Sequence, residues 1–220
     1  MRQSTRTGSM VAMVVTGVAM AVPAAEAATT CKTLKGSVVR STPSLKVVSQ
    51  STTNGKRYLG CAKPNGAVRT LGTKAIDENS GVSTTFAVVK TAGTYVLLAT
   101  GYDEGPGAFS GDRRSVIDIK TGKKRTIWDF TLAEGECSEV GGTPPGRPKQ
   151  FALGANGIVA GVFVGGDCTQ PGTQVIAFVP GRAAKVLDTG PNGTIAATSL
   201  RLEGRTVRWK HGGEDRSGSV

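Results

Sequence analysis

The amino-acid sequence predicts an all-β domain, an array of four-stranded antiparallel units that follows an N-terminal signal peptide. Three observations lead to this prediction. The chain begins with a basic segment and a short apolar run, short β-branched segments recur along the rest of it, and Gly, Asn and Pro stand between those segments. No stretch after the apolar run repeats its apolar residues with a helical period over a useful length.

The first 27 residues are typical of a cleavable secretory signal peptide. Arg2 and Arg6 precede an apolar run over residues 10–22, and Ala25-Glu26-Ala27 then supplies the small residues that signal peptidase accepts. The run is about 13 residues long, which is short for a permanent transmembrane helix. We therefore expect a secreted or extracytoplasmic protein, with association with the cell envelope and no transmembrane anchor after cleavage. An uncleaved anchor is the alternative.

Alternating side chains predict strands paired in hairpins. Val207 and Trp209 point to one side of their segment while Arg208 and Lys210 point to the other, as in a half-buried strand. Similar pairs of segments, each joined by a turn, recur along the chain. The predicted hairpins cover residues 57–71, 86–100, 115–129, 150–164, 174–188 and 199–211.

These hairpins group into units. Complete four-stranded units are predicted over residues 84–130 and 149–189, with partial units near 45–72 and from 199 to the end of the chain. Four strands in about 45 residues is the size of one propeller blade. The expected fold is a small or incomplete β-propeller-like array, with the C-terminal hairpin closing near the strands at 45–72. The total of about 14 strands is small for a ring, so a twisted stack of hairpins or a sandwich is an alternative.

Two segments carry a resemblance to known proteins. Ser115-Val-Ile-Asp-Ile-Lys-Thr-Gly-Lys-Lys124 resembles the blades of uncharacterised secreted bacterial β-propeller-like repeat proteins. The ending from Ser199 to Gly213 is similar to the closing hairpin of such proteins. The similarity covers roughly residues 45–216 and is one of pattern. It implies a scaffold, and it implies no reaction and no functional residue.

The four cysteines predict disulfides. Cys31, Cys61, Cys137 and Cys168 all follow the signal segment, and an even count in an exported chain favours two bridges. Of the three possible connectivities we expect Cys31–Cys61 and Cys137–Cys168. A zinc site would need ligands at close spacing, and no Cys-x-x-Cys pair occurs. No metal and no cofactor are therefore expected.

The charge balance bears on partners. The formal net charge is +11 for the whole chain and falls to about +10 once residues 1–27 are removed. We expect an anionic cell-envelope polymer, or another protein, as the partner. Nucleic acid is not expected, because Lys and Arg are scattered and no aromatic residues interleave with them.

Two long connections, Gly101–Arg114 and Ala133–Pro148, are the candidate binding loops. The candidate site residues are eight of the charged and aromatic residues in these connections: Tyr102, Asp103, Glu104, Asp112, Arg113, Arg114, Glu136 and Glu139. The carboxylates lack the alternating spacing of a calcium loop. His211, the one histidine, is expected in a surface turn rather than as the base of a serine hydrolase, so no catalytic residue is predicted.

The sequence thus favours a secreted, non-catalytic binding or interaction module of unknown ligand. The alternative is an extracytoplasmic enzyme, a hydrolase or lyase that acts on a glycan. Carboxylates gathered on one face of the β-structure would favour the enzyme, because glycoside hydrolysis needs two facing carboxyl groups.

Overall fold

The structure, a computed structural model, describes residues 30–76, 82–103, 110–132, 146–165 and 172–220. These residues form strands and no helix, so the all-β prediction is confirmed, and no helix that could cross a membrane occurs among them. Residues 1–27, where the signal peptide is predicted, lie outside the described residues. The strands are β1 (Ser37–Ser41), β2 (Leu45–Thr52), β3 (Gly55–Ala62), β4 (Val68–Ile76), β5 (Ser83–Ala92), β6 (Tyr95–Asp103), β7 (Ser110–Asp118), β8 (Lys124–Leu132), β9 (Arg147–Leu153), β10 (Val159–Val164), β11 (Gly172–Phe178), β12 (Lys185–Pro191), β13 (Ile195–Glu203), β14 (Thr206–His211) and β15 (Glu214–Ser219).

The strands form three antiparallel sheets in which each strand pairs only with its neighbours in the chain. One sheet has the order β1 to β8, the second runs β12-β11-β10-β9, and the third runs β13-β14-β15. All six predicted hairpins are confirmed as strand pairs. The four-stranded unit predicted over residues 149–189 is the second sheet, and the last strand of the chain is β15.

One boundary between predicted units is wrong. The partial unit near 45–72 and the complete unit over 84–130 belong to one sheet, because β4 and β5 are hydrogen-bonded to each other. Only two residue pairs make this joint, Ala75 with Thr84 and Ile76 with Ser83, whereas β5 and β6 pair along their whole length. Strand β1, which is short and mostly exposed, was not predicted.

Three apolar clusters pack the units together in chain order. The first joins β2–β4 to β5–β7, with Leu45, Phe86 and Leu98 among its members. The second joins the far side of β6–β8 to the sheet of β9–β12, and the third joins that sheet to β13–β15. Arg125 on β8 strengthens the second contact, because its guanidinium donates to the carbonyl oxygens of Gly157 and Phe178. Burial lowers the pKa of this guanidinium from its ordinary value.

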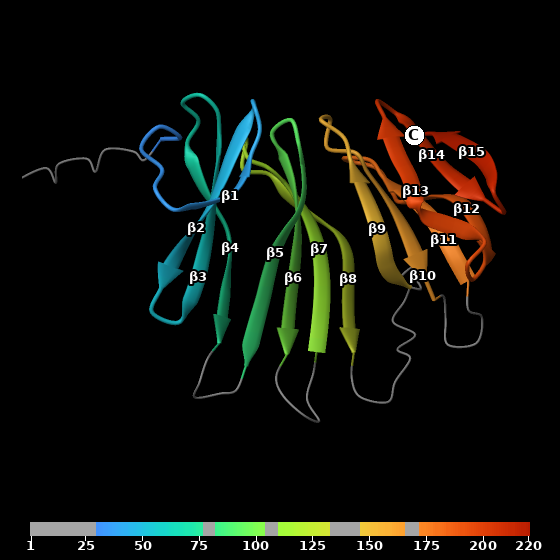
Figure 1. The fold of residues 1–220 in the computed structure, drawn as a ribbon, viewed down its shortest axis with the longest axis horizontal. Helices are drawn as coiled ribbons and strands as arrows, with labels where there is room; N and C mark the ends of the chain where they lie inside the picture. Colours follow the sequence, from blue (N-terminus) through green and yellow to red (C-terminus); the bar gives the residue numbers. More distant parts are fainter. Residues whose placement is uncertain (1–29, 77–81, 104–109, 133–145, 166–171) are drawn as a thin grey trace, which may run out of the picture.

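The array is open. Strands β1–β4 lie at one end and β13–β15 at the other (Figure 1). Leu59 on β3 and Trp209 on β14 belong to different clusters, so the expected closure of the C-terminal hairpin onto the strands at 45–72 is wrong. The reason is that neither end unit needs a ring to shield apolar side chains: the first has its own covering segment, and the outer face of the last is polar.

At the β1–β4 end, the N-terminal segment covers the sheet. Leu34 packs against Val48 and Leu59, and a disulfide joins Cys31 to Cys61 on β3. This bridge is one of the two that the sequence predicts. Cys137 and Cys168 lie outside the described residues. The bridge holds the covering segment on apolar side chains that would otherwise face water.

Candidate functional site: an open groove on β5–β7

A groove of about 410 Å³ lies on the strands β5, β6 and β7. It exists because these strands have nine or ten residues, whereas the packed strands β9–β12 have six or seven. In Figure 1 the ends of β5–β8 extend past β9 and β10. The face that is buried at Leu97 and Val116 therefore continues beyond its cover, and the uncovered part forms the floor of the groove.

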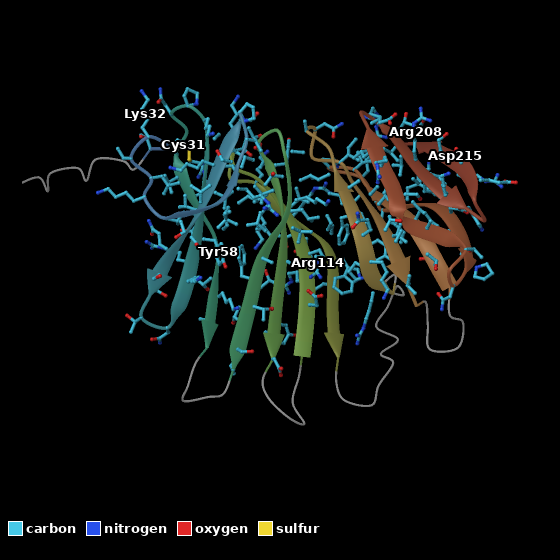
Figure 2. All side chains as sticks on the ribbon, in the orientation of Figure 1. Cys31, Lys32, Tyr58, Arg114, Arg208 and Asp215 are labelled. Carbon is cyan, nitrogen blue, oxygen red and sulfur yellow. A yellow bond between two sulfur atoms is a disulfide. The ribbon has the colours of Figure 1, made fainter. Side chains whose placement is uncertain are left out.

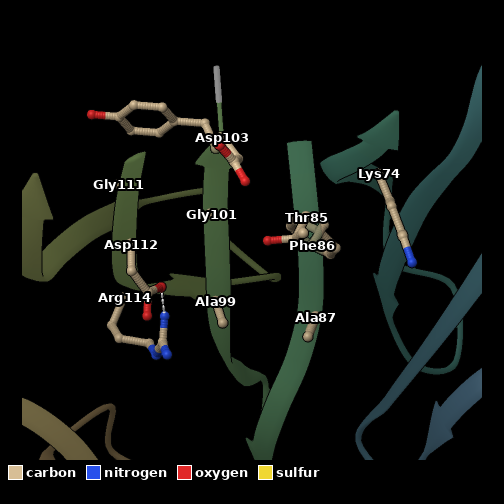
Figure 3. A pocket seen from close by; sticks show the side chains of 11 residues that line it. Lys74, Thr85, Phe86, Ala87, Ala99, Gly101, Asp103, Gly111, Asp112 and Arg114 are labelled. Carbon is tan, nitrogen blue, oxygen red and sulfur yellow. Dashed lines mark hydrogen bonds and ion pairs between the residues drawn. The ribbon is translucent and has the colours of Figure 1, made fainter. Parts of the chain in front are cut away.

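Two rows of directly opposed residues make this floor. Thr85, Gly101 and Asp112 form one row across the three strands, and Ala87, Ala99 and Arg114 form the next. Figure 3 shows the two rows side by side. The residues of these rows on β5 and on the central strand β6 have small side chains. A ligand could therefore approach the backbone closely there. Gly101 also leaves room for the Thr85 hydroxyl, which would meet a Cβ at that position.

Charged groups of both signs border the floor. Arg114 forms an ion pair with Asp112 and lies over the ring of Trp128, 5.6 Å from its centroid. Its side chain is 16% exposed, so the ring and the carboxylate hold the guanidinium in place. Lys74 on β4 lines the opposite border, and Asp103 lies at the end of β6 (Figure 3). Hydrogen-bond donors and acceptors are thus presented together on rigid strands.

Tyr102 lies at one edge of the groove. Its ring lies against Gly111, the residue directly opposite on β7, and a Cβ at that glycine would overlap the ring. Glycine is therefore needed at residue 111 for the tyrosine to keep this position.

The structure brings together four of the predicted site residues: Tyr102, Asp103, Asp112 and Arg114. It also corrects their setting, because they lie on β6 and β7 and not in an irregular loop. The polar, glycine-rich sequence is typical of a loop, but the two glycines accommodate a bulky or polar neighbour across the strand pair. Glu104, Glu136 and Glu139 lie outside the described residues.

Arg113 is the predicted site residue that the structure leaves out of the groove. It alternates with Asp112 and Arg114 along β7 and pairs instead with Asp129 on β8, at 2.7 Å. The hydrogen bond to this carboxylate raises the pKa of the Arg113 guanidinium. Sequence analysis missed Lys74 and Thr85, which come from strands earlier in the chain.

A second polar cluster joins the second sheet to the third. Asp188 on β12 accepts hydrogen bonds from Trp209 Nε1 at 2.6 Å and pairs with His211 Nδ1 at 2.9 Å. Its other carboxylate oxygen accepts from the backbone N–H of Thr189. Burial raises the pKa of Asp188, but the hydrogen bonds from Trp209 and His211 outweigh it, so the pKa lies below the ordinary value.

This cluster places His211 differently from the surface turn that the sequence predicts. The histidine ends β14, its side chain is 27% exposed, and its ring lies close to Gly190 and Thr194. Within the residues that the structure describes, its side-chain hydrogen bond goes to Asp188 and to no hydroxyl or thiol. The cluster thus links β12 of the second sheet to β14 of the third through two hydrogen bonds of one carboxylate.

No metal site is found among the described residues, because no three His, Cys, Asp or Glu side chains gather closely enough. Comparisons with protein-family models, with curated proteins and with solved structures find no match. The chemistry of the groove is therefore argued from its own residues.

Proposed function

We propose that the protein is a secreted, non-catalytic binding module, and that its all-β domain is an open, propeller-like array that serves as a rigid scaffold. The sequence pattern of a signal peptide at residues 1–27 and the Cys31–Cys61 disulfide support a location outside the cytoplasm. The groove on β5–β7 is the ligand site.

One observation favours this function most: polar groups of both signs flank a flat floor of alanine and glycine. Asp103, Asp112, Arg114, Lys74 and the Thr85 hydroxyl offer acceptors and donors around an open surface, and their formal charges cancel. Such a surface suits an uncharged, hydroxyl-rich chain, whose groups both donate and accept hydrogen bonds. A saccharide segment is the ligand class with this chemistry.

The alternative function rests on a specific feature of the same groove. Asp103 and Asp112 both line it, from adjacent strands, and two carboxyl groups are the machinery of most glycoside hydrolases. Against this, Asp112 is paired with Arg114 and is therefore engaged as an acceptor before any substrate arrives. Binding without turnover is the better supported function.

The test uses the oxidised mature protein, residues 28–220, and its retention on isolated cell envelope of the producing cell. We expect Asp103→Asn and Thr85→Val each to weaken retention by about fivefold to tenfold. The first replaces a charged acceptor with a neutral amide and the second removes a hydroxyl, and a hydrogen bond of either kind is worth about 1 to 1.5 kcal/mol to a ligand. The matched control is Arg113→Gln, which changes a neighbouring residue outside the groove. Equal retention of all three variants would contradict the proposal. Release of soluble sugar by the parent protein, lost in Asp103→Asn and Asp112→Asn, would establish the enzyme instead.

A further inference from the structure

The charges of this chain are divided very unequally between its two ends. Residues 30–76, which include β1–β4, contain nine Lys and Arg and no Asp or Glu. From residue 77 onward the chain has 16 basic and 15 acidic residues. Almost the whole positive surplus of the mature protein therefore belongs to the first unit. Asp77 and Glu78 follow it directly and lie outside the described residues.

Among the residues that the structure describes, no carboxylate forms an ion pair with these cations. Every ion pair found among the described residues lies between Asp112 and Arg216, in the later units. In the first unit the charged groups bond to neutral oxygens instead. Lys46 donates to the Leu34 carbonyl at 3.0 Å, Lys63 to the Ser41 hydroxyl at 2.9 Å, and Arg57 to the Gln50 amide at 3.0 Å. No carboxylate of the described residues compensates their charge.

Most of the cations are exposed, and the segment that carries two of them is attached to the sheet. Seven of the nine side chains belong to exposed residues: Lys32, Lys35, Arg40, Lys56, Arg57, Lys63 and Lys74. Lys32 and Lys35 lie on the covering segment, which the Cys31–Cys61 bridge and the hydrogen bond from Gln50 to the Lys35 carbonyl attach to the sheet. Figure 2 places Lys32 at this end of the array and Arg208 and Asp215 at the other.

We infer that the β1–β4 unit is a docking surface for a linear polyanion of the cell envelope. A surface with only positive charge attracts a chain of negative charges and gains affinity from the counterions that the chain releases. Of the cations of this unit, only Lys74 also lines the groove. The inference therefore extends the proposed binding function to a second surface.

Features of the same unit favour a polymer over other anionic partners. Its cations lie on the covering segment and on each of the strands β1–β4, so a flexible chain could follow them across the unit. Val38 is the exposed large apolar side chain of this unit among the described residues, which is too little for insertion into lipid. Its single aromatic residue, Tyr58, packs against Phe86 with ring centroids 4.7 Å apart and is not free to stack on a nucleic-acid base.

The experiment measures binding of the oxidised mature protein to long-chain inorganic polyphosphate and to polygalacturonate over a range of NaCl concentrations. The test variant is K32Q/K35Q/R57Q. The control variant is K149Q/R182Q/R205Q, which removes the same charge from exposed residues of the later units. We expect the test variant to bind at least tenfold more weakly at low salt. The slope of log affinity against log salt should fall by about 2, since three contacts of about 0.7 each are lost. The control variant should bind as the parent does.

Several results would overturn the inference. Equal losses of affinity in the two variants would show that only the net charge of the protein matters. If the parent protein bound neither polyanion, the first unit would not be a docking surface for such polymers. If the protein bound vesicles with anionic lipids, or duplex DNA, more tightly than either polyanion, the partner would be a membrane or a nucleic acid and not an envelope polymer. The variants leave Thr85, Asp103 and Asp112 intact, so a negative result for polyanion binding would not contradict the groove proposal. Conversely, a negative result for the groove variants would not affect the polyanion experiment.

Discussion

The units at the two ends of the array, β1–β4 and β13–β15, cover their outer faces by different means. The first has an apolar outer face, which the segment around Leu34 covers and the Cys31–Cys61 bridge secures. The last needs no cover, because its outer face is polar and carries ion pairs such as Arg208–Glu203. A terminal unit with a polar outer face is what an open stack of repeats requires. The comparison indicates that polar residues alone complete the outer face of the last unit, whereas the first unit depends on a covalent link. The cations of the first unit also form no ion pair with the carboxylates that the structure describes.

The largest expected effect is removal of the bridge at the first end. The double variant Cys31→Ala/Cys61→Ala should lose roughly 3.5 kcal/mol of unfolding free energy, because the bridge closes a long loop in the unfolded chain. Urea unfolding followed by tryptophan fluorescence measures this. The control is the same variant with and without a reducing agent. A loss below about 1 kcal/mol would show that packing of Leu34 alone holds the cover.

The next effect concerns the contact that attaches the last unit. Asp188→Ala should lower the unfolding free energy by about 1 to 3 kcal/mol at neutral pH, because it leaves the Trp209 N–H without its acceptor. The contribution of the charged carboxylate depends on pH. Since the folded-state pKa of Asp188 lies below the ordinary 3.8, its stabilisation is present above that value and is lost as the pH falls through the folded pKa.

Urea unfolding of the parent and of Asp188→Asn between pH 2 and pH 7 measures this dependence. The difference between the two proteins should be constant from about pH 5 upward and should shrink below pH 4. A difference that grows as the pH falls would contradict the direction of the Asp188 shift.

Reversing the charge of one lysine at each end should change the free energy of unfolding by a smaller amount, with opposite signs at the two ends. Lys56 and Lys74 are directly opposed on β3 and β4, whereas Lys210 is opposed to Asp215 on β14 and β15. We expect Lys56→Glu to raise the unfolding free energy and Lys210→Glu to lower it, each by about 0.2 to 1 kcal/mol, because opposed like charges repel. Thermal unfolding at low and high salt measures both, and the effects should diminish in high salt. A stabilising Lys56→Glu would also show that the like charges are kept for a purpose other than stability.

The smallest effect is expected from Arg208→Gln. Both members of the Arg208–Glu203 pair are more than half exposed, so the loss should stay below about 0.5 kcal/mol. Urea unfolding measures it, with Arg205→Gln as the unpaired control. A loss above 1 kcal/mol would mean that the ion pairs do more than make the outer face polar.

The sequence predicted the hairpins well because alternation and turn residues are local signals. The positions of Gly93, Gly122 and Gly204, which have positive φ, lie at predicted turns and fix the pairing that follows. The grouping of the hairpins into sheets was less accessible. The joint between β4 and β5 consists of two residue pairs, and nothing in the local pattern distinguishes it from a loop.

The groove was found in part. Asp103, Asp112 and Arg114 were selected for their chemistry, but irregularities in pairing near Val88 and Arg114 decide which side chains share a face. The partnership of Asp188 with Trp209 and His211 crosses two sheets and carries no local signal. The cationic first unit was readable in advance, since counting acidic residues segment by segment exposes the run from 30 to 76. Counting charge over the whole chain concealed it.

The pairing of each strand with its chain neighbours has a consequence for how the protein is made. Every hairpin forms from residues that are close in sequence, so the loop-closure entropy for each is small. A chain that emerges from a channel with its N-terminus first can therefore build this fold in the order of emergence. Cys61 appears only 30 residues after Cys31, so the first unit can be bridged before most of the chain is out. A ring joined through both termini would have to wait for the last residue, whereas here each new hairpin finds its packing surface already assembled.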